Sequence, residues 1–210
     1  MSTPGQPWLP LPELMTRVAL PVGQRCNLRQ ARFVFQPEDA PVPNVLPWLE
    51  YRWNFDFPVG MFRAIVERLR GTPARLEEIV RDASGDRLIH RAGESWSAQE
   101  HVGHLVSVEV LWHRRLEEYL LGTLRLTAAD MENRATKEAA YNGRPLTSIL
   151  AEFRTGRGAT VGILDGLDLE AASRTAHHPR LNRPMRLVDL CLFAAEHDDH
   201  HLALIHELLR

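Results

Sequence analysis

Near its C-terminal end the sequence reads EHDDHHLALI over residues 196–205. This stretch lies inside an apolar, proline-free run from Leu187 to Leu209, which is long enough for about six helical turns. On the predicted helix, His197 and His201 are four residues apart and project from one face. Apolar residues share much of that face, so we expect both imidazoles to point into the core. Two neutral imidazoles one turn apart form half of a metal site.

A third metal ligand has two candidates, His101 and His104, which lie three residues apart in a second predicted helix. Bundles commonly build metal sites from side chains on facing helices. Three nitrogen ligands suit a divalent ion such as Zn²⁺ or Ni²⁺ and leave a position open for water or substrate, as a catalytic centre requires. The alternative is that these histidines are core residues satisfied by ordinary hydrogen bonds. We expect His200 at the edge of the pocket.

Four long amphipathic segments predict an all-α protein, a four-helix bundle with long inter-helix loops. They cover about residues 59–83, 98–121, 146–164 and 186–209. Apart from a turn or short hairpin around residues 177–184, no strand is expected within residues 58–210. The loops are longer than a minimal bundle needs, so they are expected to cover one end of it.

Local signals set the limits of two of these helices. The first is either one kinked helix or two short ones, because Thr72 can cap a new helix and Pro73 suits its first position. The second begins with Ser97 and Glu100, three residues apart, which is the spacing of a capping box. Gly122 is expected to end that second helix.

The N-terminal region differs from the rest of the chain. Prolines interrupt any periodicity over residues 1–46, although a short strand is possible around residues 31–35. This proline-rich arm is expected to be disordered or loosely docked. Two alternatives are an ordered extension that packs on a partner and a true start codon further downstream. The bundle domain is expected to span residues 47–210, beginning with an aromatic patch over residues 48–57.

The composition narrows the possible partners and compartments. A net charge of −2 with no basic block favours neither a nucleic acid nor an anionic membrane as partner. No apolar stretch approaches the ~20 residues needed to span a bilayer, and the N-terminus does not resemble a secretory signal. Cys26 and Cys191 are far apart and form no metal or redox motif, so a reducing cytoplasm is expected.

Two motifs of this sequence resemble signatures of the DinB/YfiT-like family. Trp96-Ser97, followed by His104-Leu105 and Glu109, is similar to the second-helix signature of that family. The sequence HDDHHL over residues 197–202 resembles its fourth-helix signature. The resemblance covers about residues 50–210 and implies a four-helix bundle, often a homodimer, with a three-histidine site for a divalent metal. By position, it assigns the ligands to His104, His197 and His201, and so favours His104 over His101.

The resemblance also implies two classes of function. Members of the family include metal-dependent enzymes that transfer bacillithiol or mycothiol, and the mycothiol-dependent maleylpyruvate isomerase. We therefore expect an enzyme that transfers a low-molecular-weight thiol to an electrophile, or a metal-dependent hydrolase. Glu100 and Glu109 are candidate proton acceptors if they face the pocket, although solvated or capping roles suit both. The alternative is a non-catalytic metal- or ligand-binding bundle of the stress response.

Overall fold

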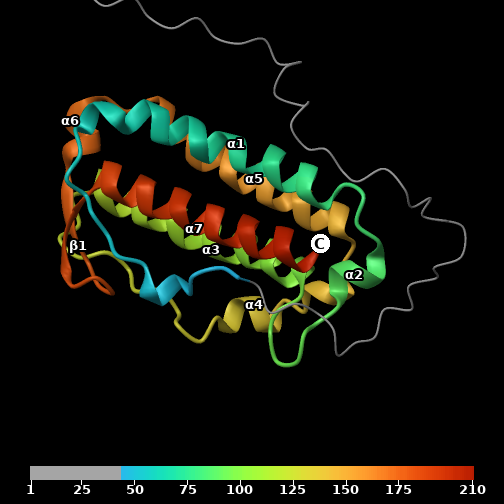
Figure 1. Cartoon of the computed structure of the whole chain (residues 1–210). Coiled ribbons are helices and arrows are strands. Elements are labelled where there is room, and N and C mark those ends of the chain that lie inside the picture. Colours follow the sequence, from blue (N-terminus) through green and yellow to red (C-terminus); the bar gives the residue numbers. More distant parts are fainter. Residues whose placement is uncertain (1–43) are drawn as a thin grey trace, which may run out of the picture. The chain divides into compact units, whose positions relative to one another are not determined.

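The computed structural model describes residues 44–210, and four long helices run through this part of the chain (Figure 1). They are α1 (Phe62–Val80), α3 (Ala98–Leu120), α5 (Leu146–Asp165) and α7 (Leu187–Leu208). The shorter helices are α2 (Gly85–Ile89), α4 (Arg134–Glu138) and α6 (Leu169–Ser173), with 3-10 turns at Trp48–Glu50, Val59–Met61 and Tyr141–Gly143. The predicted four-helix bundle is thus confirmed. Within residues 44–210, none of the helices is long and apolar enough to cross a lipid bilayer.

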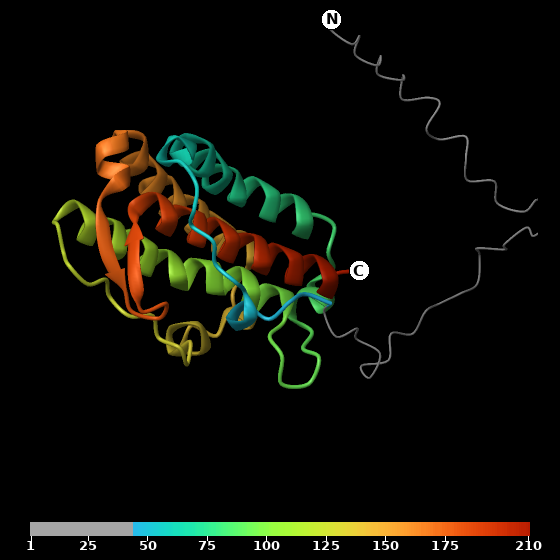
Figure 2. The ribbon, with the colours of Figure 1, turned by 60° about the vertical axis from the view of Figure 1, so that its left-hand side comes forward.

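The long helices form a four-cornered arrangement. α1 packs against α5 and α7, and α3 packs against the same two helices (Figures 1 and 2). The consecutive long helices α1 and α3 therefore stand at opposite corners of the bundle. This order explains the long connection over residues 81–97, because the chain must pass from one corner to the diagonal one.

α1 is a single helix that contains Pro73. Of the two alternatives, the structure has the single helix, and Thr72 does not cap a second one; its hydroxyl lies in the core and donates to Asp198 Oδ2 at 3.0 Å. A proline inside a helix leaves the carbonyl four residues earlier without its usual N–H partner. Here that carbonyl belongs to Leu69, and Arg157 Nη1 on α5 donates to it at 3.3 Å. A tertiary hydrogen bond thus replaces the one that Pro73 removes.

The start and the end of α3 follow local chemistry. Ser97 Oγ accepts from the backbone N–H of Glu100 at 3.1 Å, and Glu100 Oε2 accepts from the N–H of Ser97 at 3.0 Å. This is the predicted capping box. Gly122, with φ of 72°, follows the last turn of the helix. A positive φ strains most other residues, which is why a glycine suits this stop.

The chain between α6 and α7 forms a small antiparallel sheet. β1 (Thr175–His178) pairs with β2 (Arg183–Arg186), in a register that places Thr175 opposite Arg186. The short hairpin expected around residues 177–184 is thus confirmed, and its two strands extend over residues 175–186. The loop after α3 also joins it, because the N–H of Leu126 donates to the carbonyl of His177 at 3.0 Å. This contact holds that loop beside the hairpin.

The aromatic residues that precede α1 belong to the core of the bundle. Phe55 is buried, and Trp48, Trp53 and Phe57 are partly buried against the same hydrophobic cluster. Trp53 and Trp48 both contact Phe193 of α7, with ring centroids 4.6 and 5.1 Å apart. The domain boundary at residue 47 stays a prediction. The possible strand over residues 31–35 and all but three residues of the proline-rich arm lie outside the described part of the chain.

Candidate metal centre

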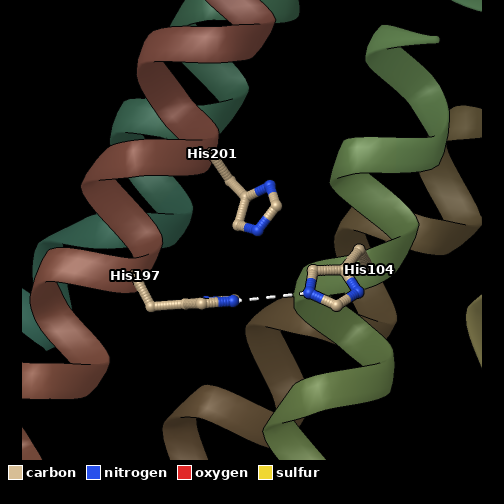
Figure 3. Close-up of side chains that lie close together, drawn as sticks. All are labelled: His104, His197 and His201. Carbon is tan, nitrogen blue, oxygen red and sulfur yellow. Dashed lines mark hydrogen bonds between the residues drawn. The ribbon is translucent and has the colours of Figure 1, made fainter. Parts of the chain in front are cut away.

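Three histidines from two helices converge inside the bundle. His104 projects from α3, and His197 and His201 project from successive turns of α7 (Figure 3). One ring nitrogen from each lies within 4.8 Å of the other two, and all three residues are buried. The Nε2 atoms of His104 and His197 are 3.4 Å apart. The side chains that the metal prediction requires therefore meet at one point, while their role as ligands stays a prediction.

The His104 and His197 nitrogens have the spacing of two ligands of one metal ion. Nitrogen–zinc bonds of about 2.05 Å in a tetrahedral site place the ligand nitrogens about 3.3 Å apart. The 3.4 Å separation of the His104 and His197 nitrogens agrees with this value. His197 Nδ1 is buried and has no hydrogen-bond partner among residues 44–210. The donor set fits a divalent cation of borderline character, and leaves at least one coordination position without a protein ligand.

Neighbouring groups orient two of the three imidazoles. His104 Nδ1 lies 3.0 Å from Thr136 Oγ1, and His201 Nδ1 lies 3.0 Å from His101 Nδ1. An imidazole whose Nδ1–H donates to such a partner presents an unprotonated Nε2 to a metal. His101 is thus placed to orient His201, whereas spacing alone had left it as a rival ligand to His104.

Burial keeps these imidazoles in the neutral form that metals bind. It lowers the pKa of His104 to about 4, with a further contribution from nearby His200. Burial lowers the pKa of His197 and His201 well below the usual range, and neighbouring histidines lower it further. Because a metal ligand must be deprotonated, this environment makes the site ready for a cation at neutral pH.

The three histidines form part of the wall of a cavity of about 470 Å³. Most of the remaining wall is apolar and aromatic, and its rings belong to Trp48, Trp96, Trp112 and Phe193. His200 also lines the cavity, as expected for a residue at the pocket edge. The Trp96 ring is tilted against that of His104, with centroids 4.9 Å apart, and Trp48 lies edge-on to His197 at 5.1 Å. The cavity therefore combines polar nitrogens with walls that favour an apolar ligand.

Segments far apart in the sequence close this cavity. Trp48 comes from the chain before α1, Thr136 from α4, and His178 and Arg180 from the hairpin. The side chain of His178 is buried, and its Nε2 lies 3.2 Å from Arg115 Nη1. The sequence carried no signal for these neighbours, because each depends on the path of a loop.

The two candidate proton acceptors are engaged elsewhere. Glu100 forms the capping box and an ion pair with Arg91. Glu109 is buried, and its carboxylate accepts from Arg157 Nε at 2.9 Å and from Thr160 Oγ1 at 2.6 Å. Neither carboxylate lines the cavity that contains the three histidines. Glu100 has the capping role considered from sequence, whereas Glu109 belongs to a buried ion cluster.

Asp198, the neighbour of His197, is also buried. Its side chain is 0% exposed and pairs with Arg157, which is 2% exposed. Residue 198 is one position from His197 and therefore lies about 100° round the helix, toward α1 and α5. Asp199 is partly exposed and pairs with Arg68 and Arg75. Three consecutive residues of α7 therefore lie in different places: His197 lines the cavity, Asp198 belongs to the buried ion cluster, and Asp199 pairs at the surface.

The sequence profile of the DinB superfamily matches residues 68–205, a range that covers more than half of the chain and contains all three histidines. The chain belongs to the DinB superfamily. Its DinB fold is also seen in a solved structure, YfiT from Bacillus subtilis, with a TM-score of 0.65 and 23% sequence identity. The alignment covers 76% of this chain and 91% of YfiT. At this identity, the likeness establishes a shared fold.

YfiT is described as "a probable metal-dependent hydrolase with an unusual four-helix bundle topology". No protein with a curated description matches this DinB chain significantly. The buried three-histidine group of this DinB protein suggests a divalent metal ion by its geometry. Zinc or nickel as the identity of that ion stays a prediction.

Proposed function

We propose that this DinB protein is a divalent-metal-dependent enzyme that transfers a low-molecular-weight thiol, of the bacillithiol or mycothiol type, to an electrophile. The observation that supports this most is the meeting of His104, His197 and His201 at the wall of a cavity of about 470 Å³. A purely structural metal site is more often closed by four protein ligands. Here three ligands adjoin a space large enough for a small substrate.

The residues of the chain have separate tasks in this proposal. His104, His197 and His201 would hold the cation, and Thr136 and His101 would keep His104 and His201 in the required tautomers. The aromatic walls would exclude water, which strengthens electrostatic interactions inside the cavity. A divalent cation bound there supplies Lewis acidity, which lowers the pKa of a thiol or a water molecule that reaches its open position.

The placement of the carboxylates favours a thiol over water as the nucleophile. A free thiol has a pKa of about 8.5, close to neutrality, whereas water needs far more assistance to lose a proton. Among residues 44–210, the carboxylate that lines the cavity is Asp130, which accepts from two backbone N–H groups, at 3.1 Å from Glu132 and 2.8 Å from Arg134. Among the described residues, the cavity thus offers no free carboxylate as a general base, which suits the nucleophile that requires less proton transfer.

Hydrolysis is the second candidate, and the description of YfiT favours it. The same three histidines would serve in that case, with water in place of the thiol. The two reactions differ in the substrate that they consume, so parallel assays distinguish them.

The test begins with metal analysis of the purified full chain. We expect about one divalent ion per chain, by analogy with other three-histidine sites. The ion should be lost in His197→Ala and kept in His206→Ala, a matched control because His206 is an exposed residue of the same helix. The metal-loaded protein is then assayed for conjugation of several thiols to monochlorobimane and for hydrolysis of p-nitrophenyl acetate.

Each outcome has a distinct meaning. Conjugation that disappears in His197→Ala supports thiol transfer, whereas ester hydrolysis alone supports the second candidate. Tight metal binding without either activity would overturn the enzymatic proposal in favour of a metal- or ligand-binding bundle. Retention of metal by His197→Ala would overturn the assignment of the site itself.

A further inference from the structure

Arg115 carries a positive charge inside the bundle and forms no ion pair with an acidic side chain among residues 44–210. The residue lies on α3, lines the cavity of the three histidines and is 1% exposed. Its Nε donates to the carbonyl of Thr127 at 2.9 Å, and its Nη1 lies 3.2 Å from His178 Nε2. Its Nη2 is buried and has no hydrogen-bond partner among residues 44–210. A buried charge with an unused donor is costly unless something supplies an acceptor.

A second arginine, Arg180, lines the same cavity and, among residues 44–210, also forms no ion pair with a carboxylate. Arg180, in the turn of the β1–β2 hairpin, places its guanidinium 5.4 Å from the ring centre of Trp48 and 5.2 Å from that of Phe193. Within the described part of the chain, it has no hydrogen bond or ion pair with a carboxylate. The aromatic faces stabilise its charge in part, and leave its N–H donors available.

The surroundings do not neutralise these two charges. Burial lowers the pKa of Arg115 to about 10, and Arg180 contributes to that lowering, so Arg115 stays protonated at neutral pH. Burial also lowers the pKa of Arg180. Burial, together with the two arginines, lowers the pKa of His178 to about 3, which leaves it uncharged. The charge of Glu118 raises the pKa of Arg115. The Glu118 carboxylate accepts hydrogen bonds from the backbone and the side chain of Thr127.

Other charged groups of the cavity wall have partners of their own. Asp130 accepts from the backbone of Glu132 and Arg134, and its carboxylate lies 3.4 Å from the Arg134 side chain. Arg114 is largely exposed and lies 3.6 Å from Glu118. The positive charge of Arg115 and Arg180 is thus the unbalanced part of the wall. Next to it lie the rings of Trp48 and Phe193, which favour an apolar ligand body.

We propose that Arg115 and Arg180 bind the carboxylate of the substrate, and that the substrate class is a carboxylic acid with an aromatic or otherwise apolar body. This inference rests on the proposed function, because it names a substrate for the same cavity. The carboxylate would accept from Arg115 Nη2 and from the free donors of Arg180. Its apolar body would lie against the aromatic wall, with its reactive end directed toward the three histidines.

The test compares two probes of nearly identical shape, 2-naphthoate and 2-naphthamide, of which only the first is charged. Binding to the full chain is measured by calorimetry and by tryptophan fluorescence, in metal-free and zinc-loaded protein at low ionic strength. We expect naphthoate to bind about tenfold or more tightly than naphthamide, as charge-assisted hydrogen bonds imply. Arg180→Gln should remove this preference by weakening naphthoate binding alone. Arg154→Gln, which removes an exposed arginine of α5, should leave the preference intact.

His197→Ala separates this inference from the proposed function. A naphthoate preference that persists in metal-free protein and in His197→Ala supports the arginine site, even if no metal-dependent turnover is found. If the preference for naphthoate is lost when the metal is removed but is kept in Arg180→Gln, the carboxylate binds the metal and not the arginines. That result would overturn the inference. Equal affinity for both probes, or no saturable naphthoate binding up to ~10 mM, would also overturn it. Arg115→Gln should repeat the Arg180→Gln result; if that buried variant does not fold, Arg180→Gln decides.

Discussion

Gly103, the residue before His104 on α3, leaves room for another part of the chain. A Cβ at this position would lie 2.1 Å from the ring of Tyr141. The ring therefore packs directly on the helix backbone, and its hydroxyl lies 2.9 Å from Ser107 Oγ. Gln99 Nε2 donates to the carbonyl of Tyr141 at 2.7 Å. These contacts hold the loop that carries Thr136, the partner of His104.

Gly103→Ala is expected to destabilise the protein by about 1–3 kcal/mol, because the added methyl overlaps an aromatic ring that is fixed on several sides. Gly158→Ala is the matched control. It lies on α5 with nothing within 4 Å of its added Cβ, so helix propensity should stabilise this variant by up to about 1 kcal/mol. Chemical unfolding of both variants measures these changes. Equal stability of Gly103→Ala and the wild type would show that the Tyr141 ring moves freely.

Cys191 is a buried thiol on α7, and burial raises its pKa to about 12. The thiolate is the reactive form of cysteine, and a raised pKa makes it scarce at any pH below about 12. In a Cys26→Ser variant, where Cys191 is the only cysteine, we expect almost no reaction with Ellman's reagent at pH 8 in the native state. One equivalent should react in guanidinium chloride. Fast native labelling would contradict the burial of this thiol.

At the scale of elements, one ion cluster joins the four long helices. Arg157 on α5 pairs with Glu109 on α3 at 2.7 Å and with Asp198 on α7, and it donates to the carbonyl of Leu69 on α1. Burial raises the pKa of Asp198, and the Arg157 charge opposes that rise. All three charged side chains are at most 6% exposed. The cluster therefore depends on its internal pairing, since water cannot replace a missing partner.

Arg157→Met is expected to cost about 3–5 kcal/mol in the free energy of unfolding, because it leaves two buried carboxylates without their cation. Arg154→Met, one turn earlier on α5, is the control. Arg154 forms an exposed pair with Glu77 at 2.7 Å, so its loss should cost less than about 1 kcal/mol. Denaturant titrations give both values. Similar costs for the two variants would mean that the buried cluster contributes no more than a surface pair.

At the scale of the whole molecule, the segment before α1 completes both the core and the cavity. Trp53 and Phe55 pack on the core, and Trp48 forms part of the cavity wall beside His197. Segments from both ends of the described region thus enclose the three-histidine site of this DinB protein.

A chain that starts at residue 44 is expected to melt at a higher temperature than one that starts at residue 58. The longer form keeps several buried aromatic side chains, each of which contributes roughly 1.5–3 kcal/mol by burial. Melting followed by circular dichroism compares the two forms. Equal melting temperatures would show that residues 44–57 add nothing to the stability of the bundle, and would move the domain boundary to α1.

Much of the fold was predictable because its signals are local. The 3.6-residue spacing of apolar side chains marked the four helices, and Ser97, Glu100 and Gly122 marked the limits of α3. The i,i+4 spacing of His197 and His201 put both on one face of α7, since helix geometry alone determines that relation. Spacing left His101 and His104 equivalent as candidates for the third ligand, and only the family resemblance favoured His104.

The sequence by itself therefore determined which segments form the four long helices, where α3 begins and ends, and which two histidines share a face. Only the tertiary structure decided that Asp198 is buried against Arg157, that Glu109 does not line the cavity, and that Arg115 and Arg180 both do. The physical reason is that a helical pattern reports on neighbours one turn away. A buried ion pair or a cavity wall depends instead on how distant segments, joined by long loops, pack against one another.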